Sequence, residues 1–187
     1  MTETALSLDE ATRPSAPKLP QVTETQREAG RHLAAIHRAY LSDMARIKMV
    51  LERIEAGDAP PEHLQQVVLS LDMAQNYRAF GSLCGQGCQI LTMHHNIEEQ
   101  SMFPGIERRA VEGIRAVVAR LREEHKVVHA LIELLQQASV DLIDTPSEAT
   151  FAAASNAFTQ LEAVVRSHFR YEETELEEAI GVYLDSI

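Results

Sequence analysis

Histidine and glutamate recur in this chain as pairs spaced four residues apart, at His94–Glu98, His125–His129 and His168–Glu172. Four residues is about one turn of an α-helix, so the two members of each pair share a helix face. Imidazole and carboxylate groups together bind zinc, iron, nickel or manganese. With His37 upstream, the set offers five imidazoles and two carboxylates, too many for one tetrahedral site. The sequence therefore predicts a centre of two metal ions bridged by carboxylates.

Helices must position these residues, and the apolar pattern predicts where they lie. The first is expected to begin at a capping box formed by Thr23 and Gln26 and to end at Gly57–Asp58. The third is expected from Val111 to Ile143, and the fourth follows the turn at 144–147. Their inward-facing seams, spaced by threes and fours, comprise Leu33, His37, Tyr40, Met44, Ile47, Leu51 and Ile54; then Ile114, Val118, Leu121, His125, Val128, Ile132 and Leu135; then Phe151, Ala154, Phe158, Leu161, Val165, His168 and Glu172.

The second helical segment, from Pro61 through Glu98, is too long for one straight helix. The distance from His37 to the end of the first helix is ~28 Å, whereas a straight return from Pro61 to His94 would cover ~50 Å. Both histidines can share a site only if the segment breaks or bends, and Gly81–Gly87 is the expected place. Phe103–Gly105, which contains Pro104, is expected to end this helix or bend it sharply.

Composition indicates an all-α chain with a single bundle domain. Hydrophobic residues make up 45% of the 187 residues, Trp is absent, and no stretch alternates as a strand would. Residues 1–22, with Pro14, Pro17 and Pro20, are predicted to be a flexible tail, and 23–187 the bundle. We expect an up-down four-helix bundle with an elongated, glycine-bent second segment.

Charge and hydropathy exclude several classes of function. The net charge of −11 is unfavourable for nucleic acid or an anionic membrane. No run is long enough to span a membrane, and no apolar secretory signal is visible, so we expect a cytoplasmic protein. Cys84 and Cys88 are too few for a disulfide framework and are expected to be small packed residues.

Several assignments within the site stay open. His95 and Glu99 repeat the spacing of His94 and Glu98 one position later, and only one of the two pairs is expected to face the interior. The other pair would support the ligands from outside or lie on the surface. Tyr40 and Tyr77 are expected near the level of His37, where a phenol could reach a metal or hydrogen-bond a bound ligand, although a core aromatic role is favoured. Glu133, four residues after His129, could accept a hydrogen bond from an imidazole.

The order of these motifs resembles the hemerythrin family, which includes the HHE cation-binding domains. The resemblance covers roughly residues 25–178 and is sharpest at His94–Pro104, where His-x-x-x-Glu-Glu precedes an apolar-aromatic-Pro run. It implies a four-helix bundle with two non-haem iron ions joined by an oxo or hydroxo group, although zinc or manganese would suit the same donors. The implied ligands are His37, His94, Glu98, His125, His129, His168 and Glu172, with Glu98 and Glu172 as bridges.

Two departures from the oxygen-carrying members of that family argue against simple oxygen carriage. The last carboxylate is Glu172, four residues after His168, where those members have Asp at five, and the second segment is unusually long. We therefore expect a di-iron protein that binds or reacts with O2, hydrogen peroxide or NO, served by a redox partner that the sequence does not identify. Three alternatives stay open. The protein could be an enzyme that decomposes peroxide or reduces NO, it could be a bundle for metal or redox sensing or iron storage without turnover, or it could be a metal-free bundle.

Overall fold

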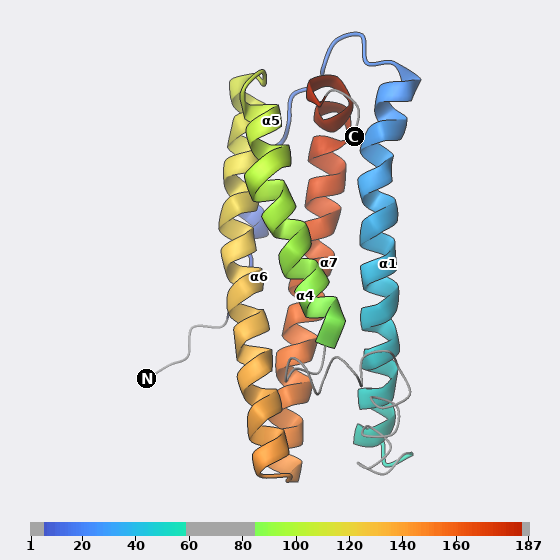
Figure 1. The fold of residues 1–187 in the computed structure, drawn as a ribbon, viewed down its shortest axis with the longest axis vertical. Helices are drawn as coiled ribbons and strands as arrows, with labels where there is room; N and C mark the ends of the chain where they lie inside the picture. The colour runs from blue at the N-terminus through green and yellow to red at the C-terminus, as the bar shows by residue number, and fades with distance from the viewer. Residues whose placement is uncertain (1–5, 59–84, 185–187) are drawn as a thin grey trace. The chain divides into compact units, whose positions relative to one another are not determined.

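The computed structural model describes residues 6–58 and 85–184, and in these ranges the chain is helical with no strand. This agrees with the all-α prediction. The elements are the short 3-10 helix η1 (Glu10–Thr12), α1 (Glu24–Glu55), α4 (Gly85–Ile97), the π-helix η2 (Glu98–Met102), α5 (Phe103–Glu107), α6 (Glu112–Asp144) and α7 (Glu148–Tyr183), which are shown in Figure 1. Within the described ranges, no helix combines the length and the apolar character that crossing a bilayer requires.

The chain divides into two compact units. The first takes in the described parts of 1–39, 93–128 and 164–187, and the second those of 40–92 and 129–163. The second unit has its own buried apolar residues, among them Leu51, Leu135 and Phe158, and a salt bridge of 3.0 Å between Lys48 and Glu162. The first unit holds every donor of the candidate site described below.

The predicted seams of α1, α6 and α7 are confirmed, because all their members are buried except Tyr40 and Phe151, which are partly exposed. The capping box is also confirmed. The backbone N–H of Thr23 donates to Gln26 Oε1 at 2.8 Å, and the N–H of Gln26 donates to Thr23 Oγ1 at 3.3 Å. Local sequence signals therefore place α1 correctly, and His37 faces inward with its seam.

The stretch from α4 to α5 stays helical through Pro104 instead of ending there. The five residues of η2 form a π-helix, and the N–H of Phe103 donates to the carbonyl of Glu98. The ring of a proline clashes with the carbonyl four residues earlier in a regular α-helix, and this wider turn lies directly before Pro104. The predicted glycine bend at Gly81–Gly87 lies mostly outside the described residues, so it stays a prediction.

The first and last helices of the first unit approach each other very closely, as the adjacent start of α1 and end of α7 show in Figure 1. A Cβ atom at Gly181 would lie 1.9 Å from the backbone oxygen of Gln26, and one at Gly30 would lie 2.2 Å from that of Glu177. Only glycine fits at these two contacts.

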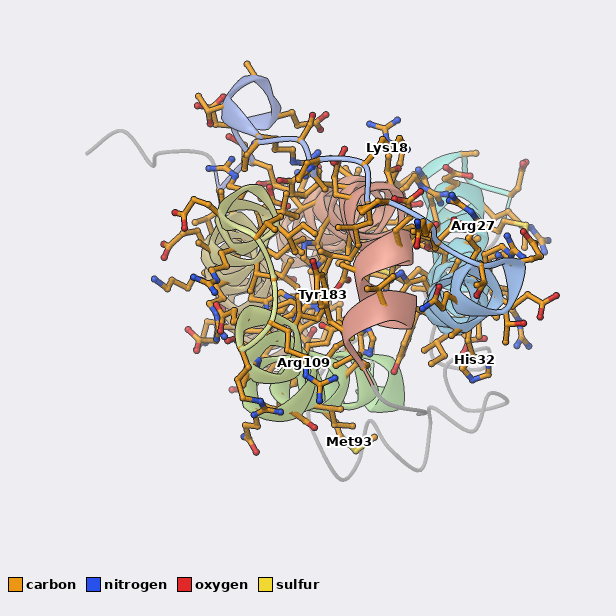
Figure 2. The ribbon with its side chains drawn as sticks, turned by 90° about the horizontal axis from the view of Figure 1, so that it is seen from above. Lys18, Arg27, His32, Met93, Arg109 and Tyr183 are labelled. Carbon is orange, nitrogen blue, oxygen red and sulfur yellow. The ribbon has the colours of Figure 1, made fainter. Side chains whose placement is uncertain are left out.

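Residues 6–22, which belong to the predicted N-terminal tail, contact α6 and α7; we call this segment the N-terminal strap. The backbone N–H of Ala16 donates to Glu175 at 2.5 Å and that of Leu19 to Glu178 at 3.0 Å. Proline blocks a helix here, but it also lowers the entropy lost when an extended segment is ordered. Figure 2 shows the strap passing α7, with Lys18 pointing away from the helices.

Candidate metal centre

Two groups of buried metal-binding side chains lie in the first unit. One comprises His37, His94, Glu98 and Glu172, and the other comprises His95, His125 and His168. Within each group the candidate donor atoms all lie within 4.8 Å of one another. The members come from α1, α4, η2, α6 and α7, so residues far apart in the sequence converge in the interior.

In the first group, two imidazole nitrogens face each other. His37 Nε2 lies 2.9 Å from His94 Nε2, and His94 Nε2 lies 2.9 Å from Glu98 Oε1. Glu172 Oε2 lies 3.6 Å from His37 Nε2. Metal–nitrogen bonds of ~2.1 Å at right angles would put two ligand nitrogens ~3 Å apart, so these separations are those of donors to one ion.

The two carboxylates of the first group also reach toward the second. Glu98 Oε2 lies 3.4 Å from His125 Nε2, and Glu172 Oε2 lies 4.0 Å from His168 Nε2. Within the second group the rings of His95 and His125 stack with centroids 4.0 Å apart, and those of His125 and His168 are 4.9 Å apart. Glu98 and Glu172 thus lie between the groups, where bridging ligands would be needed.

Three of the imidazoles are held from outside by a carboxylate on Nδ1. The partner oxygen lies 2.9 Å from His37 Nδ1 in Glu173, 2.8 Å from His125 Nδ1 in Glu99, and 3.2 Å from His168 Nδ1 in Glu124. A carboxylate accepts, so each Nδ1 carries the proton and each Nε2 presents its lone pair inward. Carboxylate–histidine pairs of this kind orient metal ligands and make them more basic.

Two of these outer carboxylates, Glu99 and Glu124, also form ion pairs with arginines. Arg122 forms an ion pair with Glu99 and donates to Glu107 Oε2 at 3.0 Å. Glu124 accepts from Arg13 and from Arg120. Although burial opposes its ionisation, hydrogen bonds from His168 and Arg13 outweigh that effect and lower the pKa of Glu124 to about 2.

Burial shifts the pKa values of the site's histidines in the direction that favours the neutral side chain. Burial, together with repulsion from His94 and His168, lowers the pKa of His37 to about 2. Burial also lowers the pKa of His94 and of His168. Burial therefore favours the neutral form of these three imidazoles, which is the form that binds a metal ion.

The pKa values of the two interior glutamates, Glu98 and Glu172, shift upward, which is opposite to the shift of the histidines. Burial raises the pKa of Glu98 well above its ordinary value, and Glu99 adds to the effect. Burial, followed by the charge of Glu98, raises the pKa of Glu172. Among the described residues, the carboxylate oxygens of both glutamates and Nε2 of His168 are buried without a hydrogen-bond partner. Leaving such groups unsatisfied is costly, whereas a cation would satisfy them all, so the donor set fits metal ions.

Aromatic rings close the site on two sides. Phe169 stacks on His37 with centroids 3.7 Å apart and an angle of 1° between the planes. Phe103 is fully buried and stacks on His125 at 5.5 Å. Both rings pack against imidazoles of the site and restrict their orientation.

The structure brings together six of the seven predicted ligands, all except His129. His129 is partly exposed and belongs to neither group, so its role as a ligand stays a prediction. The expectation that only one of the pairs His94/Glu98 and His95/Glu99 faces the interior fails for the histidines, whose side chains are 8% and 0% exposed and belong to different groups. It holds for the glutamates, because Glu98 is 2% exposed and Glu99 is 27% exposed and belongs to neither group. Successive residues on a helix differ in direction by about 100°, which allows adjacent histidines to serve two different ions.

Three other predicted residues have less direct outcomes. Tyr40 is partly exposed on α1, and its contact with a metal or a bound ligand stays a prediction. Tyr77 lies outside the described residues, so its place near the metals stays a prediction. Glu133, expected as a possible acceptor for an imidazole, has an exposed side chain on α6.

The carboxylates that hold the imidazoles are Glu99, Glu124 and Glu173. A supporting role was left open for Glu99 but was not expected for Glu124 or Glu173. Each is a direct neighbour of a predicted ligand in the sequence: Glu99 follows Glu98, Glu173 follows Glu172, and Glu124 precedes His125. This adjacency was the signal available in the sequence.

Comparison with known proteins agrees with this geometry. The family model described as the hemerythrin HHE cation binding domain matches residues 31–180, a span that contains all seven members of the two groups. No curated protein and no solved structure matches the chain significantly. Because the family model covers most of the sequence and includes both groups of donors, the chain belongs to the hemerythrin HHE cation-binding family.

Proposed function

We propose that this protein holds two iron ions in its first unit and uses them to bind or react with a small oxidant. His37 and His94 would bind one ion, and His95, His125 and His168 the other. Glu98 and Glu172 would bridge the pair. The observation that carries the proposal is the position of Glu98, whose two oxygens lie 2.9 Å from His94 Nε2 and 3.4 Å from His125 Nε2.

The mixture of donors is one that iron accepts. Five imidazoles with two carboxylates are compatible with iron, and also with zinc or manganese, so metal identity is part of the proposal. When bound, the ions would supply Lewis-acid and redox chemistry. The chain's own part is to hold the imidazoles with Nε2 inward through Glu99, Glu124 and Glu173.

Packing around the site supports a small ligand. Phe103, Phe169 and His95 are at most 1% exposed, so a bulky substrate has no room beside them. O2, hydrogen peroxide and NO are small enough to enter with modest side-chain motion. We also propose that the chain is an up-down four-helix bundle, the architecture that this family implies, and that a separate redox partner supplies electrons.

The test is to load metal-free protein with ferrous ions under anaerobic conditions and add each oxidant in excess. O2 and NO are added together with a chemical reductant and compared with a protein-free control, because each turnover of these two consumes electrons that two ferrous ions supply only once. Consumption of many equivalents per protein would indicate turnover, and uptake of about one equivalent would indicate binding for sensing or storage. The matched variants are His168→Ala, within the site, and His32→Ala, which is exposed on α1. The proposal expects His168→Ala to lose the reaction and His32→Ala to retain it. No reaction with any of the three oxidants would contradict it.

Chelation separates a metal protein from a metal-free bundle. Ligands that bind only the folded state stabilise it, by about 2.7 kcal/mol per site at a hundredfold excess over Kd. Removing the ions from the loaded protein should therefore lower the melting temperature by several degrees, ~2–4 °C per kcal/mol for a chain of this size. An unchanged melting temperature would favour the metal-free alternative.

A further inference from the structure

Arg13, on the N-terminal strap, forms a two-pronged contact with Glu124 of α6. Its Nε donates to Glu124 Oε1 at 2.8 Å, and its Nη2 donates to Oε2 at 2.9 Å. Both side chains are nearly buried, with 9% and 1% exposed. Paired N–H···O bonds of this kind fix the plane of a carboxylate as well as its position.

The carboxylate that Arg13 fixes is the one that holds His168. Glu124 Oε2 accepts from His168 Nδ1 at 3.2 Å, so a continuous chain of contacts runs from Arg13 to Glu124 to a donor of the second metal group. Arg13 also donates through Nη1 to the hydroxyl of Ser167, the neighbour of His168 on α7, at 3.0 Å. One guanidinium therefore ties α6 and α7 together beside the candidate ligand.

The strap is anchored so that Arg13 has little freedom. The hydroxyl of Tyr171 donates to the carbonyl of Pro14 at 2.7 Å, and its ring lies under the guanidinium with 4.6 Å from Arg13 Cζ to the centroid. On the other side, Arg120 donates to the carbonyl of Asp9 in a contact of 2.5 Å. Backbone contacts thus hold the strap on both sides of Arg13.

We propose that Arg13 is a positioning residue for the metal centre: through Glu124 it fixes the tautomer and the orientation of His168, and thereby strengthens binding of the ion in the second group. The strap lies outside residues 31–180, the part of the chain that the family model matches, so this is a contribution of the chain's own N-terminal segment. It rests on the proposed metal centre for its consequence, but its geometry stands on hydrogen bonds that contain no metal.

Arg120 is a weaker candidate for the same role. It donates to Glu124 from Nε to Oε1 at 3.1 Å, and 22% of its side chain is exposed. Among the hydrogen bonds of the described residues, it is Arg13 and not Arg120 that donates to Glu124 Oε2, the oxygen that accepts from His168. Arg13 is therefore the arginine whose loss should be felt at His168.

The test compares Arg13→Gln and Arg13→Lys with Arg27→Gln in the full-length chain. Arg27 is a matched control, because it also pairs with a glutamate, Glu178 of α7, at 2.5 Å, and Glu178 is not a partner of His168. The first readout is the ring ¹⁵N spectrum of His168 in metal-free protein. The second is the rate of zinc release to a chelator from zinc-loaded protein.

The wild-type and Arg27→Gln proteins should show His168 with its proton on Nδ1. Arg13→Gln should shift population toward the Nε2–H tautomer and release zinc from one of the two sites about tenfold faster, the low end of the effect of removing an outer partner of a metal-bound histidine. The tautomer population and the zinc release rate of Arg13→Lys should lie between those of wild type and Arg13→Gln. The lysine ammonium keeps the positive charge but cannot form the two parallel hydrogen bonds of the guanidinium.

A His168 spectrum in Arg13→Gln that is identical to that of wild type would overturn the proposal, as would zinc release within twofold of wild type. If Arg13→Gln does not fold, Arg13→Lys gives the same comparison. Failure of the proposed function is distinguishable, because it would appear as wild-type protein that takes up no metal, whereas the tautomer of His168 is read without any.

Discussion

Glu98 and His125 belong to different helices, η2 and α6, and lie 3.4 Å apart from Oε2 to Nε2. The next residue, Glu99, accepts from Nδ1 of the same ring at 2.8 Å. Two consecutive carboxylates at the start of the π-helix therefore lie close to the two ring nitrogens of His125, Glu98 to Nε2 and Glu99 to Nδ1. Glu98 faces the interior and Glu99, 27% exposed, faces outward. In the proposed centre Glu98 would bridge the two ions and Glu99 would hold the imidazole of His125.

Replacing Glu98 with Gln should disrupt the metal pair, because a neutral amide does not replace the charge of a bridging carboxylate. We expect E98Q to bind one metal ion or none where the wild type binds two, as measured by titration of metal-free protein with zinc in a calorimeter. Glu123→Gln is the control, since Glu123 is exposed on α6 and paired with Lys126. Two ions bound to E98Q with wild-type affinity would contradict a bridging role.

His95 and His129 offer a direct comparison between the geometry and the sequence pattern. His95 is fully buried in the second group, whereas His129 is partly exposed and lies in neither group. We expect His95→Ala to weaken binding of one ion by at least tenfold and His129→Ala to leave two ions bound, by the same titration. The opposite ranking would restore His129 to the ligand set and remove His95 from it.

The sequence predicted the helices well because their signals are local. The seam of α1 and its capping box depend on residues a few positions apart, and buried Leu33, His37 and Met44 follow the expected spacing. The His-x-x-x-Glu spacing likewise identified two pairs of residues that are all buried at the site, His94 with Glu98 and His168 with Glu172.

What the sequence did not predict depends on contacts between distant residues. The inward position of His95 places it beside His125 of α6 and His168 of α7. The spacing of residues within α4 does not reveal these neighbours. The role of Arg13 depends on Glu124, a residue 111 positions later. Composition predicts a tail for the proline-rich N-terminal segment, and it does not show that the backbone N–H groups of Ala16 and Leu19 donate to carboxylates of α7.

Glu124 should make the stability of the metal-free protein depend on pH in the acid range. Its pKa is lowered in the folded state from the ordinary 4.5 to about 2, so the unfolded chain binds the extra proton between these values. The carboxylate therefore contributes stability above pH ~4.5, and that contribution is lost as the pH falls toward 2. Glu124→Gln should cost about 3 kcal/mol at pH 7, because it leaves Arg13 without its buried partner.

Urea unfolding of both proteins from pH 7 to pH 3 measures this difference. The gap in the free energy of unfolding between wild type and E124Q should narrow steadily below pH ~4.5. Glu123→Gln, at an exposed position, should show a small and nearly constant gap. A gap for E124Q that stays constant or widens in acid would mean that the ion pair does not act as described.

Gly181→Ala should be strongly destabilising, because its Cβ would lie 1.9 Å from the backbone oxygen of Gln26 and would force α1 and α7 apart. Overpacking typically costs about 1–3 kcal/mol, and a backbone neighbour that cannot rotate away puts this variant at the upper end. Thermal unfolding should show a loss of ~6–12 °C. Gly57→Ala, where no described neighbour lies within 4 Å of the added Cβ but φ is +76°, should cost only about 1 kcal/mol. Equal losses in the two variants would contradict the close approach of the helices.

The count of metal ions in freshly purified protein tests the central claim most directly. Seven buried donors in two adjoining groups, with Glu98 and Glu172 between them, predict two ions per chain and, if the proposed identity is right, two irons by elemental analysis. A protein that is folded and carries no metal, and that takes up none when ferrous ions are supplied without oxygen, would contradict the account.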